Sequence, residues 1–589
     1  MGGRSEIKAR SLQSRHRHRL WRDERRLAAL VGAHARMYVS TRRRGWDQEY
    51  GDRRMTMRFR FQNMTSSRGD EVPLIAAGVT CIVGANNAGK SQLLRDLVNT
   101  AQNGARSSTV VLRSAGVELL VNDAEEAGKW LERHALPSEH PTVPPSFMFL
   151  PSQNEVTKDA FFQHLTGALQ GDWGLGYLDE GFVRRIPAGA LSSFASGELR
   201  TDASPDSNRN WLLRQLYSNG DLERELSALV ENLFSTPIFL DRQNFPPRVR
   251  AGVMDVEVPP ANAITARYAK AAAGIPALDD QGDGIRSFTG LALVVLALAP
   301  EVLLLDEPES FLHPGQARAV GRWLAEAARE RNIQVLASTH DKDFLIGLLS
   351  AGRNDALQVV RVDRHPDGSS FRATTSDQLN DYWGDPVLRF SNVLQGLFHE
   401  RVIVCEGDVD CRFYAAAGEE LAIEINRRQV TDNTLFVPSG GKNGMPKLLG
   451  VLGDLGVDAS VVADFDVLDS ADTLQSIVRS LGTEWDDELA NAYAAAAKQI
   501  PTPADAFWRA TKKSGMSVVP RGDATRDFSR LIELLRFRRL HVLTVGELED
   551  FHRPVGKGPE WLSAALTANA HRSAEVQALL TQVIPDLAV

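Results

Sequence analysis

The chain contains few cysteines and no long uninterrupted apolar run. Its three cysteines, Cys81, Cys405 and Cys411, are too few among 589 residues for a disulfide framework or a cysteine-rich zinc module, and they suit a reducing cytoplasm. The most apolar stretch, 291–305, is broken by a proline and a glutamate, so it is too short to span a bilayer. The composition, 43% hydrophobic and 24% charged, excludes a disordered or collagen-like chain. The length predicts about two to four domains.

Acidic charge is in excess but unevenly distributed. Residues 1–54 hold 15 Lys and Arg against 6 Asp and Glu; since the whole chain holds 67 against 75, the remainder carries 52 against 69. An acidic body disfavours wholesale electrostatic wrapping of DNA, but it is compatible with a local basic groove or with carboxylates that need a metal. Residues 1–54 lack apolar periodicity, so we predict a basic, disordered extension. Either translation begins near Met55 or Met57, or the extension is a flexible arm.

Beyond the extension, short apolar runs alternate with helical periodicity. In the first part of the chain, strands are predicted at 57–61, 79–83, 109–113, 117–121, 147–150, 237–240, 302–305, 334–337 and 357–362. Residues 157–234 lose the strand signal and are interpreted as a helical insertion. A second run of strands is predicted at 402–405, 434–437, 461–463 and 540–543. This alternation predicts an α/β fold with mainly parallel sheets covered by helices on both faces.

A glycine-rich loop joins the predicted strand 79–83 to a helix that starts at Lys90. The sequence from Gly84 to Ser91, GANNAGKS, satisfies the Walker A pattern in its expected strand–loop–helix context. Backbone N–H groups of the loop would cradle phosphates, Lys90 would reach the β and γ phosphates, and Ser91 would hold magnesium. The alternative is a plain glycine turn before a helix. The residues predicted to bind the nucleotide here are Gly84, Asn86, Asn87, Gly89, Lys90, Ser91 and Gln92.

The run 302–307, VLLLDE, supplies the matching Walker B motif. A buried strand there would deliver Asp306 to the magnesium ion and Glu307 to the attacking water, the division of roles that phosphoryl transfer needs. One strand further on, His340 follows the run 334–337, where ABC-type ATPases place a histidine that contacts the γ phosphate. Capping of the next helix is the simpler alternative for this histidine.

Two weaker features accompany these motifs. Residues 281–288, QGDGIRSF, open the helix before Walker B, which is the location of the ABC signature, although the usual Ser-Gly-Gly core is absent. Such an element would complete the nucleotide site of a partner subunit, and a plain glycine turn is the alternative. Gln153 is predicted as a Q-loop residue that binds the nucleotide, with an ordinary polar loop residue as the equal alternative.

Carboxylates also follow two strands in the last third of the chain. In VIVCEGDVDCRFY, Glu406 follows the strand 402–405 and Asp410 lies four residues later at a helix start. The strand 461–463 is followed by Asp464 and Asp466. Carboxylates at the C-terminal ends of neighbouring parallel strands can converge on a divalent metal, and oxygen ligands select Mg²⁺ or Mn²⁺ over zinc. The alternative is two unrelated acidic strand exits.

A glutamate after one strand and Asp-x-Asp after a later one resembles the Toprim domain. The complete order of motifs resembles the OLD (overcoming lysogenization defect) family of ATP-dependent nucleases, a plan that the Gabija defence nuclease subunit shares. The resemblance covers residues 57–589. It implies an ABC-type P-loop ATPase domain over 55–395, with the helical insertion at 157–234, followed by a Toprim nuclease domain over 396–589.

The resemblance also assigns residues and partners. It makes Glu406, Asp410, Asp464 and Asp466 metal ligands or acid–base groups, with Glu406 and Asp464 as catalytic groups. Residues 546–551, GELEDF, are similar to the later acidic motif of the family, which adds Glu547 and Glu549 as metal ligands. The family uses a lysine after this motif, for which Lys557 is the nearest candidate, with a solvated loop lysine as the alternative.

The expected activity is therefore ATP-dependent cleavage of DNA with Mg²⁺ or Mn²⁺, in anti-phage defence or DNA processing. Expected partners are DNA, a second copy of the chain in a homodimer or higher even oligomer, and a helicase or other defence protein. The main rival is a non-nucleolytic ATPase of the SMC or RecF type that acts as a DNA clamp or sensor. A topoisomerase would need a DNA-gating domain for which little chain is left, and a primase would need a zinc ribbon.

Overall fold

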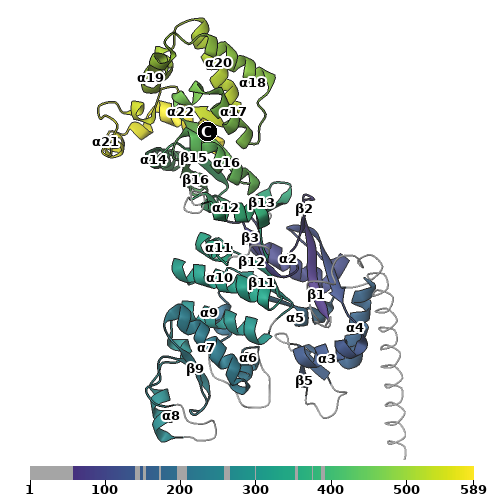
Figure 1. Cartoon of the computed structure of the whole chain (residues 1–589). Helices are drawn as coiled ribbons and strands as arrows, with labels where there is room; N and C mark the ends of the chain where they lie inside the picture. Colours follow the sequence, from purple (N-terminus) through teal and green to yellow (C-terminus); the bar gives the residue numbers. More distant parts are fainter. Residues whose placement is uncertain are drawn as a thin grey trace, which may run out of the picture. The chain divides into compact units, whose positions relative to one another are not determined.

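A computed structural model describes residues 57–138, 146–149, 154–171, 174–195, 208–257, 265–298, 300–351, 356–374, 376–385 and 392–588. The elements fall into two compact units, and the change between them lies inside α12 (Ser376–Gly384) (Figure 1). Both units are α/β. None of the helices in the described part of the chain is long and apolar enough to cross a membrane. The extension predicted at 1–54 lies outside the described residues.

The first unit is built on a six-stranded sheet with the order β14–β13–β3–β12–β11–β8. Its strands are β3 (Gly78–Val83), β8 (Val183–Ile186), β11 (Val302–Asp306), β12 (Gln334–Ser338), β13 (Leu357–His365) and β14 (Gly368–Thr374). All neighbours pair in parallel except β13 and β14. Every residue of β3, β11 and β12 is buried, as expected for central parallel strands covered on both faces. The predicted α/β class with a mainly parallel sheet is confirmed.

Ten α-helices of this unit lie within the described residues. They are α2 (Lys90–Asn103), α3 (Ala124–His134), α4 (Lys158–Gln170), α5 (Asp179–Phe182), α6 (Asn208–Ser218), α7 (Gly220–Phe234), α8 (Ala266–Ala273), α9 (Asp283–Leu293), α10 (Pro314–Glu330) and α11 (Lys342–Leu349). Helix α2 contacts β8, β11 and β12, and α10 contacts β3. In α2, Leu93, Leu94 and Leu97 are fully buried in the same core as Leu304 and Leu336 of the central strands. This apolar stripe holds the helix that starts at Lys90 against the sheet.

Two smaller antiparallel sheets precede the insertion. One has the order β2–β1–β4, from β1 (Arg58–Ser66), β2 (Glu71–Pro73) and β4 (Leu112–Leu120), and the other joins β5 (Leu136–Ser138), β6 (Ser146–Phe149) and β7 (Asn154–Thr157). The prediction of separate strands at 109–113 and 117–121 is wrong, because β4 is continuous. Strand β1 pairs with β4 from Leu112 to Leu120, and at its centre the Gly116 N–H donates to Asn63 Oδ1 at 2.8 Å.

The predicted helical insertion at 157–234 is interrupted by a strand of the central sheet. Strand β8 pairs in parallel with β11 at the sheet edge. Its sequence, VRRI, has two arginines at its centre and therefore lacks the apolar run by which a buried strand is predicted. Arg184 on this strand is nevertheless buried. The strand predicted at 237–240 exists as β9 (Ile238–Asp241), yet it pairs with β10 (Arg248–Ala251) in a separate two-stranded antiparallel sheet. The apolar run at 237–240 thus predicted a strand correctly, but it did not predict which sheet the strand joins.

The second unit contains a four-stranded parallel sheet with the order β16–β15–β17–β18. Its strands are β15 (Arg401–Cys405), β16 (Thr434–Pro438), β17 (Asp458–Ala463) and β18 (Leu540–Val542). Its helices are α14 (Asp408–Glu424), α15 (Arg428–Asp432), α16 (Met445–Asp454), α17 (Ala471–Ser480), α18 (Asp487–Lys498), α19 (Ala504–Ser514), α20 (Asp523–Phe537), α21 (Trp561–Thr567) and α22 (Ala574–Val583). Helices α17 to α20 form the connection from β17 to β18, so this crossover carries a helical layer of its own.

Candidate functional site

The Walker A loop runs from the end of β3 to the start of α2. Gly89, the residue before the helix, has a φ of 102°, and a Cβ there would come within 2.9 Å of Val111 Cγ2. Glycine is therefore required at this position for both conformation and space. The loop delivers Lys90 to the first turn of α2, and the backbone N–H groups at the start of a helix suit an anion. Lys90 is largely buried, and this burial lowers its pKa against the opposing charges of Glu307, Asp306 and Glu309.

The Walker B carboxylate lies beside the Walker A serine. The parallel register pairs Asp306 with Ser338 on β12. Asp306 Oδ1 accepts hydrogen bonds from Ser91 Oγ at 2.8 Å and from Ser338 Oγ at 2.6 Å. The structure thus brings together Ser91 and Asp306, the two residues predicted to hold magnesium, although they are 215 positions apart in sequence.

Glu307 and His340 form a second pair at the ends of β11 and β12. His340 Nδ1 lies 3.1 Å from Glu307 Oε1. Glu307 has a φ of 50°, an unusual value for a non-glycine residue, and its N–H donates to the Ser338 carbonyl at 3.0 Å. A carboxylate held in such a sparsely populated conformation beside a histidine suits a group that must orient a water.

Sequence reasoning missed Glu309, two residues further on. It is 5% exposed, and its Oε1 accepts a hydrogen bond from Thr339 Oγ1 at 2.5 Å. Its Oε2 is buried without a hydrogen-bond partner among the described residues. Burial raises the pKa of Glu309 to about 8. The available signal was a third acidic residue that follows the Walker B pair after a single proline.

Three further predictions concern Gln92, Gln153 and the signature element. Gln92 donates from Nε2 to Asp96 Oδ1 at 2.8 Å, so its side chain lies along the helix. Gln153 lies outside the described residues. The predicted signature element opens α9, whose N-cap is Gly282, and Arg286 pairs with Asp283 at 3.0 Å within its first turn.

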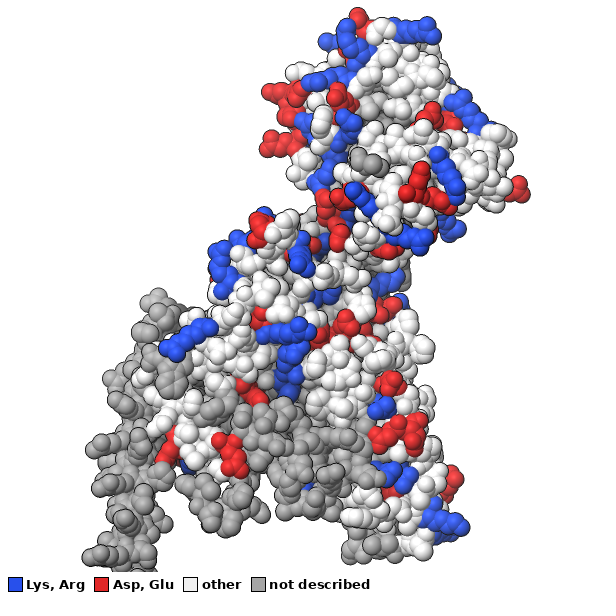
Figure 2. Space-filling view, turned by 180° about the vertical axis from the view of Figure 1, so that it is seen from behind, with Lys and Arg blue, Asp and Glu red and all other residues white. Residues whose placement is uncertain are grey.

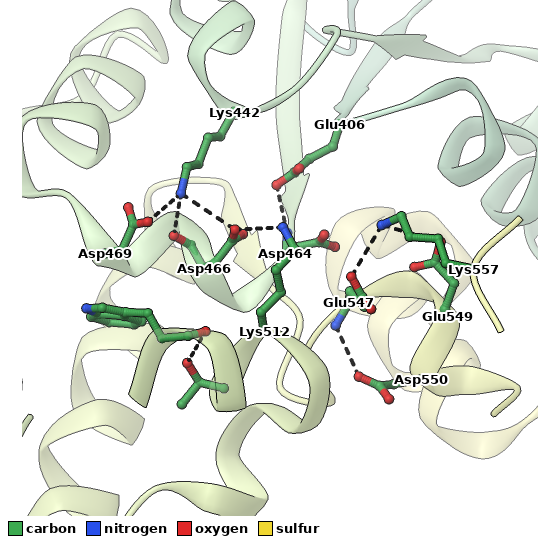
Figure 3. Close-up of polar contacts among 12 residues, drawn as sticks. Glu406, Lys442, Asp464, Asp466, Asp469, Lys512, Glu547, Glu549, Asp550 and Lys557 are labelled. Carbon is green, nitrogen blue, oxygen red and sulfur yellow. Dashed lines mark hydrogen bonds and ion pairs between the residues drawn. The ribbon is translucent and has the colours of Figure 1, made fainter. Parts of the chain in front are cut away.

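Three carboxylates converge at the C-terminal edge of the second sheet (Figure 3). Glu406 directly follows β15, and Asp464 and Asp466 follow the adjacent parallel strand β17. Each offers one oxygen, and these oxygens lie within 4.8 Å of one another. The Asp464 N–H donates to Glu406 Oε1 at 3.3 Å, which joins the two strand ends directly. The loop after β16 supports this edge, since the Gly441 N–H donates to the Glu406 carbonyl at 2.9 Å.

The electrostatics of this cluster favour a bound cation. Burial, followed by the charges of Glu406, Asp410 and Asp466, raises the pKa of Asp464 to about 8, and burial and Asp466 raise that of Glu406. Asp464 Oδ1 and Asp466 Oδ1 are buried and lack a hydrogen-bond partner among the described residues. Buried carboxylate oxygens without donors are costly, and an oxygen-only ligand set matches Mg²⁺ or Mn²⁺. The residues present therefore fit a divalent metal.

The remaining predicted ligands lie in a neighbouring group. Asp410 Oδ2 accepts from the Gly407 N–H at 3.1 Å as a cap of α14, and burial raises its pKa to about 6. Glu547 and Glu549 follow β18, and Lys557 Nζ lies 3.3 Å from Glu547 Oε2 and 3.5 Å from Glu549 Oε1 (Figure 3). Asp410, Glu547 and Glu549 are not among the three residues whose oxygens share the 4.8 Å cluster. The later acidic motif thus forms a second carboxylate group with its own lysine.

Two lysines at the cluster were not predicted as site residues. Lys442 donates to the Asp466 carbonyl at 2.9 Å and to Asp469 Oδ2 at 2.7 Å. Lys512, on α19, donates to Asp466 Oδ2 at 2.8 Å (Figure 3). Lys442 stands in the turn that follows β16, and its two bonds join this turn to the loop after β17. Lys512 comes 46 residues after its partner and carried no sequence signal.

Comparisons with known proteins match a part of each of the two units. Residues 189–347 match the family "AAA domain, putative AbiEii toxin, Type IV TA system", and residues 397–466 match "Overcoming lysogenization defect protein-like, TOPRIM domain". These two matches, in this order, fit the ATPase–Toprim architecture of the OLD family. The first match contains Asp306, Glu307 and His340, and the second contains Glu406 and Asp464.

The individual relatives of the chain are distant. The OLD nuclease of Thermus scotoductus is 28% identical over 217 residues, which are 35% of this chain and 39% of that protein. The chain therefore matches about two fifths of the length of this relative. An uncharacterized protein of Methanocaldococcus jannaschii is 26% identical over 89 residues, 15% of this chain and 78% of that protein. A solved Smc head bound to the C-winged helix domain of ScpA is 13% identical with a TM-score of 0.31, covering 54% of this chain and 97% of that one.

Proposed function

We propose that the protein is an ATPase that cleaves DNA with a divalent metal held by its Toprim carboxylates. The observation that carries this proposal is the convergence of Glu406, Asp464 and Asp466 at adjacent strand ends, where two buried oxygens lack a donor among the residues that the structure describes. A divalent cation bound there would activate a water and offset the charge of the scissile phosphate. Glu406, Asp464 and Asp466 would hold this cation, and the bond from the Asp464 N–H to Glu406 keeps the two strand ends in register.

The second carboxylate group extends the same chemistry. Asp410, Glu547 and Glu549 would hold a second cation, with Lys557 beside Glu547 and Glu549. An ammonium at this edge can stabilise negative charge that develops on a phosphate during cleavage. Lys557 has an exposed side chain, so it is free to turn from the carboxylates towards a nucleic acid.

In the ATPase unit, Lys90, Ser91 and Asp306 would hold the triphosphate and its magnesium. Their placement supports this role, since Ser91 and Asp306 already share a hydrogen bond and Lys90 opens α2. Glu307 would orient the attacking water and take its proton, while His340, 3.1 Å away, would fix that carboxylate and contact the γ phosphate. ATP hydrolysis would then regulate DNA cleavage.

We further propose DNA as the substrate and a role in anti-phage defence or DNA processing, in concert with a helicase or other defence protein. Basic and acidic side chains are interspersed over both units on the face drawn in Figure 2. Such a surface supports DNA contact at the carboxylate site in preference to wrapping by a broad basic surface.

The test of the nuclease uses Asp464→Ala and a matched control, Asp472→Ala, which removes an exposed aspartate from α17 in the same unit. Supercoiled and linear DNA are incubated with each protein and Mg²⁺ or Mn²⁺, with and without ATP. We expect Asp464→Ala to lose at least about 100-fold in cleavage, since even outer partners of metal ligands are worth about 10–100-fold. ATP hydrolysis should persist, because Lys90, Ser91, Asp306 and Glu307 belong to the first unit.

Two outcomes would contradict the proposal. Equal cleavage by Asp464→Ala and wild type would show that the metal ligands are other residues. A wild-type protein that binds DNA but cuts nothing under any of these conditions would favour the clamp or sensor.

We also propose a homodimer or higher even oligomer. The element at the start of α9 would act as an ABC signature and serve the nucleotide of a partner subunit. Light scattering with and without ATP should give an even multiple of the 64.7 kDa chain mass. A monomer in both conditions would contradict the assignment of that element.

A further inference from the structure

Lys512 makes a contact that the proposed chemistry does not use. Its Nζ donates to Asp466 Oδ2 at 2.8 Å, so a positive charge already occupies one oxygen of the carboxylate cluster. A lysine side chain is ordinarily an ammonium, with donors and no acceptor, and it stands here against a carboxylate.

We propose that Lys512 is a tethered cation that competes with the divalent metal for the Asp466 carboxylate. In the metal-free protein it neutralises part of the cluster, and it must release Asp466, or weaken its bond, when the metal binds. This inference rests on the metal site of the proposed function. It adds that Lys512 regulates how readily the metal occupies that site.

The backbone of Lys512 is fixed at the sheet edge by close contacts around the end of α19. Gly515, just after the helix, has a φ of 51°, and a Cβ there would lie 2.0 Å from the Thr544 carbonyl oxygen. A Cβ on Gly546, in the loop after β18, would lie 2.7 Å from the carbonyl oxygen of Lys512 itself. Only glycines permit this approach, so α19 is pressed against the loop that leads to Glu547.

The side chain, in contrast, can move. Lysine has a flexible four-carbon stem, and the Lys512 side chain is 40% exposed, so its ammonium can leave Asp466 for water while the backbone stays in place. The tether keeps the effective concentration of this cation at the cluster high and constant. A fixed backbone with a mobile charged end is what a competitor for a metal requires.

The other lysine at the cluster has a different role. Lys442 is bonded to the Asp466 carbonyl and to Asp469, and its Nζ lies 3.6 Å from Asp466 Oδ2. It can keep both short bonds whichever cation Asp466 binds. Lys512 bonds directly to an oxygen of a proposed ligand, and two cations that share one carboxylate repel each other.

The experiment measures metal binding in the full-length, nucleotide-free, metal-stripped protein. Mn²⁺ is titrated into wild type, Lys512→Met and Lys512→Gln, and free Mn²⁺ is followed by electron paramagnetic resonance. Lys512→Arg keeps the charge, and Lys513→Met removes the charge of the adjacent, exposed lysine as a matched control. Binding that disappears in Asp464→Ala is assigned to the cluster.

We expect Lys512→Met and Lys512→Gln to bind Mn²⁺ at the cluster at least 10-fold more tightly than wild type. Lys512→Arg and Lys513→Met should resemble wild type. The melting temperature of the metal-free protein should fall in Lys512→Met, because the carboxylates lose their counter-charge, and saturating Mn²⁺ should restore it. Gln retains a donor to Asp466, so Lys512→Gln provides the affinity if Lys512→Met fails to fold.

Equal or weaker Mn²⁺ binding in the neutral variants would overturn the inference. If those variants then showed only a raised KM for DNA, Lys512 would be a phosphate contact and not a competitor for the metal. A wild-type protein without any Asp464-dependent Mn²⁺ binding would instead refute the metal site, and with it the proposed nuclease.

Discussion

Glu309 offers a test of the electrostatics behind the Walker B strand. Its side chain is 5% exposed, one oxygen accepts from Thr339 Oγ1 at 2.5 Å, and the other has no partner among the described residues. Burial raises its pKa from 4.5 to about 8, so the folded protein keeps this carboxyl protonated at neutral pH. Glu309→Gln places a neutral group of the same shape in the same position. It should be tolerated at pH 7, unlike a change that buries a new charge.

The size of the effect follows from the two pKa values. The stabilisation from a carboxyl with a raised folded-state pKa is complete below pH 4.5 and is lost as the pH rises through about 8. Between these limits the unfolded chain has released the proton and the folded chain has not, so the free energy of unfolding falls by about 1.4 kcal/mol per pH unit. From about pH 5 to 7 this group alone costs wild type about 2.7 kcal/mol. Glu309→Gln does not titrate, so its stability relative to wild type should rise by that amount.

The assay is calorimetric unfolding of wild type, Glu309→Gln and Glu307→Gln at pH 5, 6 and 7. The transition of the ATPase unit is identified as the one that Mg-ATP shifts upward in wild type. Glu307→Gln is the control because it keeps Glu309, so the pH dependence that Glu309 confers on wild type should remain in this variant. Parallel behaviour of Glu309→Gln and wild type would show that Glu309 is ionised at neutral pH, and would refute the reasoning.

Other predictions concern catalysis directly. Lys90→Ala should abolish ATP hydrolysis in a steady-state phosphate-release assay, because the ammonium that offsets the phosphate charge is lost; a normal rate would remove the Walker A assignment. Glu307→Gln should bind ATP with near wild-type affinity in equilibrium dialysis but turn it over at least about 100-fold more slowly, and unimpaired turnover would exclude Glu307 as the base. Lys557→Met should slow DNA cleavage by about 10–100-fold at saturating DNA without changing ATP hydrolysis; unchanged cleavage would make Lys557 an ordinary loop lysine.

The motifs that carry the candidate chemistry could be predicted because they are local. A run such as VLLLDE predicts both a buried strand and carboxylates at its end. Its apolar side chains favour burial of the strand, and charged side chains are seldom buried, so the strand ends where they begin. The same logic located Glu406 and Asp464 at the ends of β15 and β17. Parallel strands in one sheet present these ends at one edge, so convergence of the two carboxylates was predictable once the sheet was assumed.

Tertiary packing decided what local sequence could not encode. Strand β8 joins the central sheet although its arginines mask the strand signal, and β9 leaves that sheet for a hairpin with β10. Lys512 reaches Asp466 only because two glycines let α19 approach the loop after β18, a contact between segments distant in the chain. Residue type and spacing determine which segments form strands and where charge leaves the core. Which charges then meet depends on how non-adjacent elements pack, because side-chain contacts act over a few ångströms in space, whatever the distance along the chain.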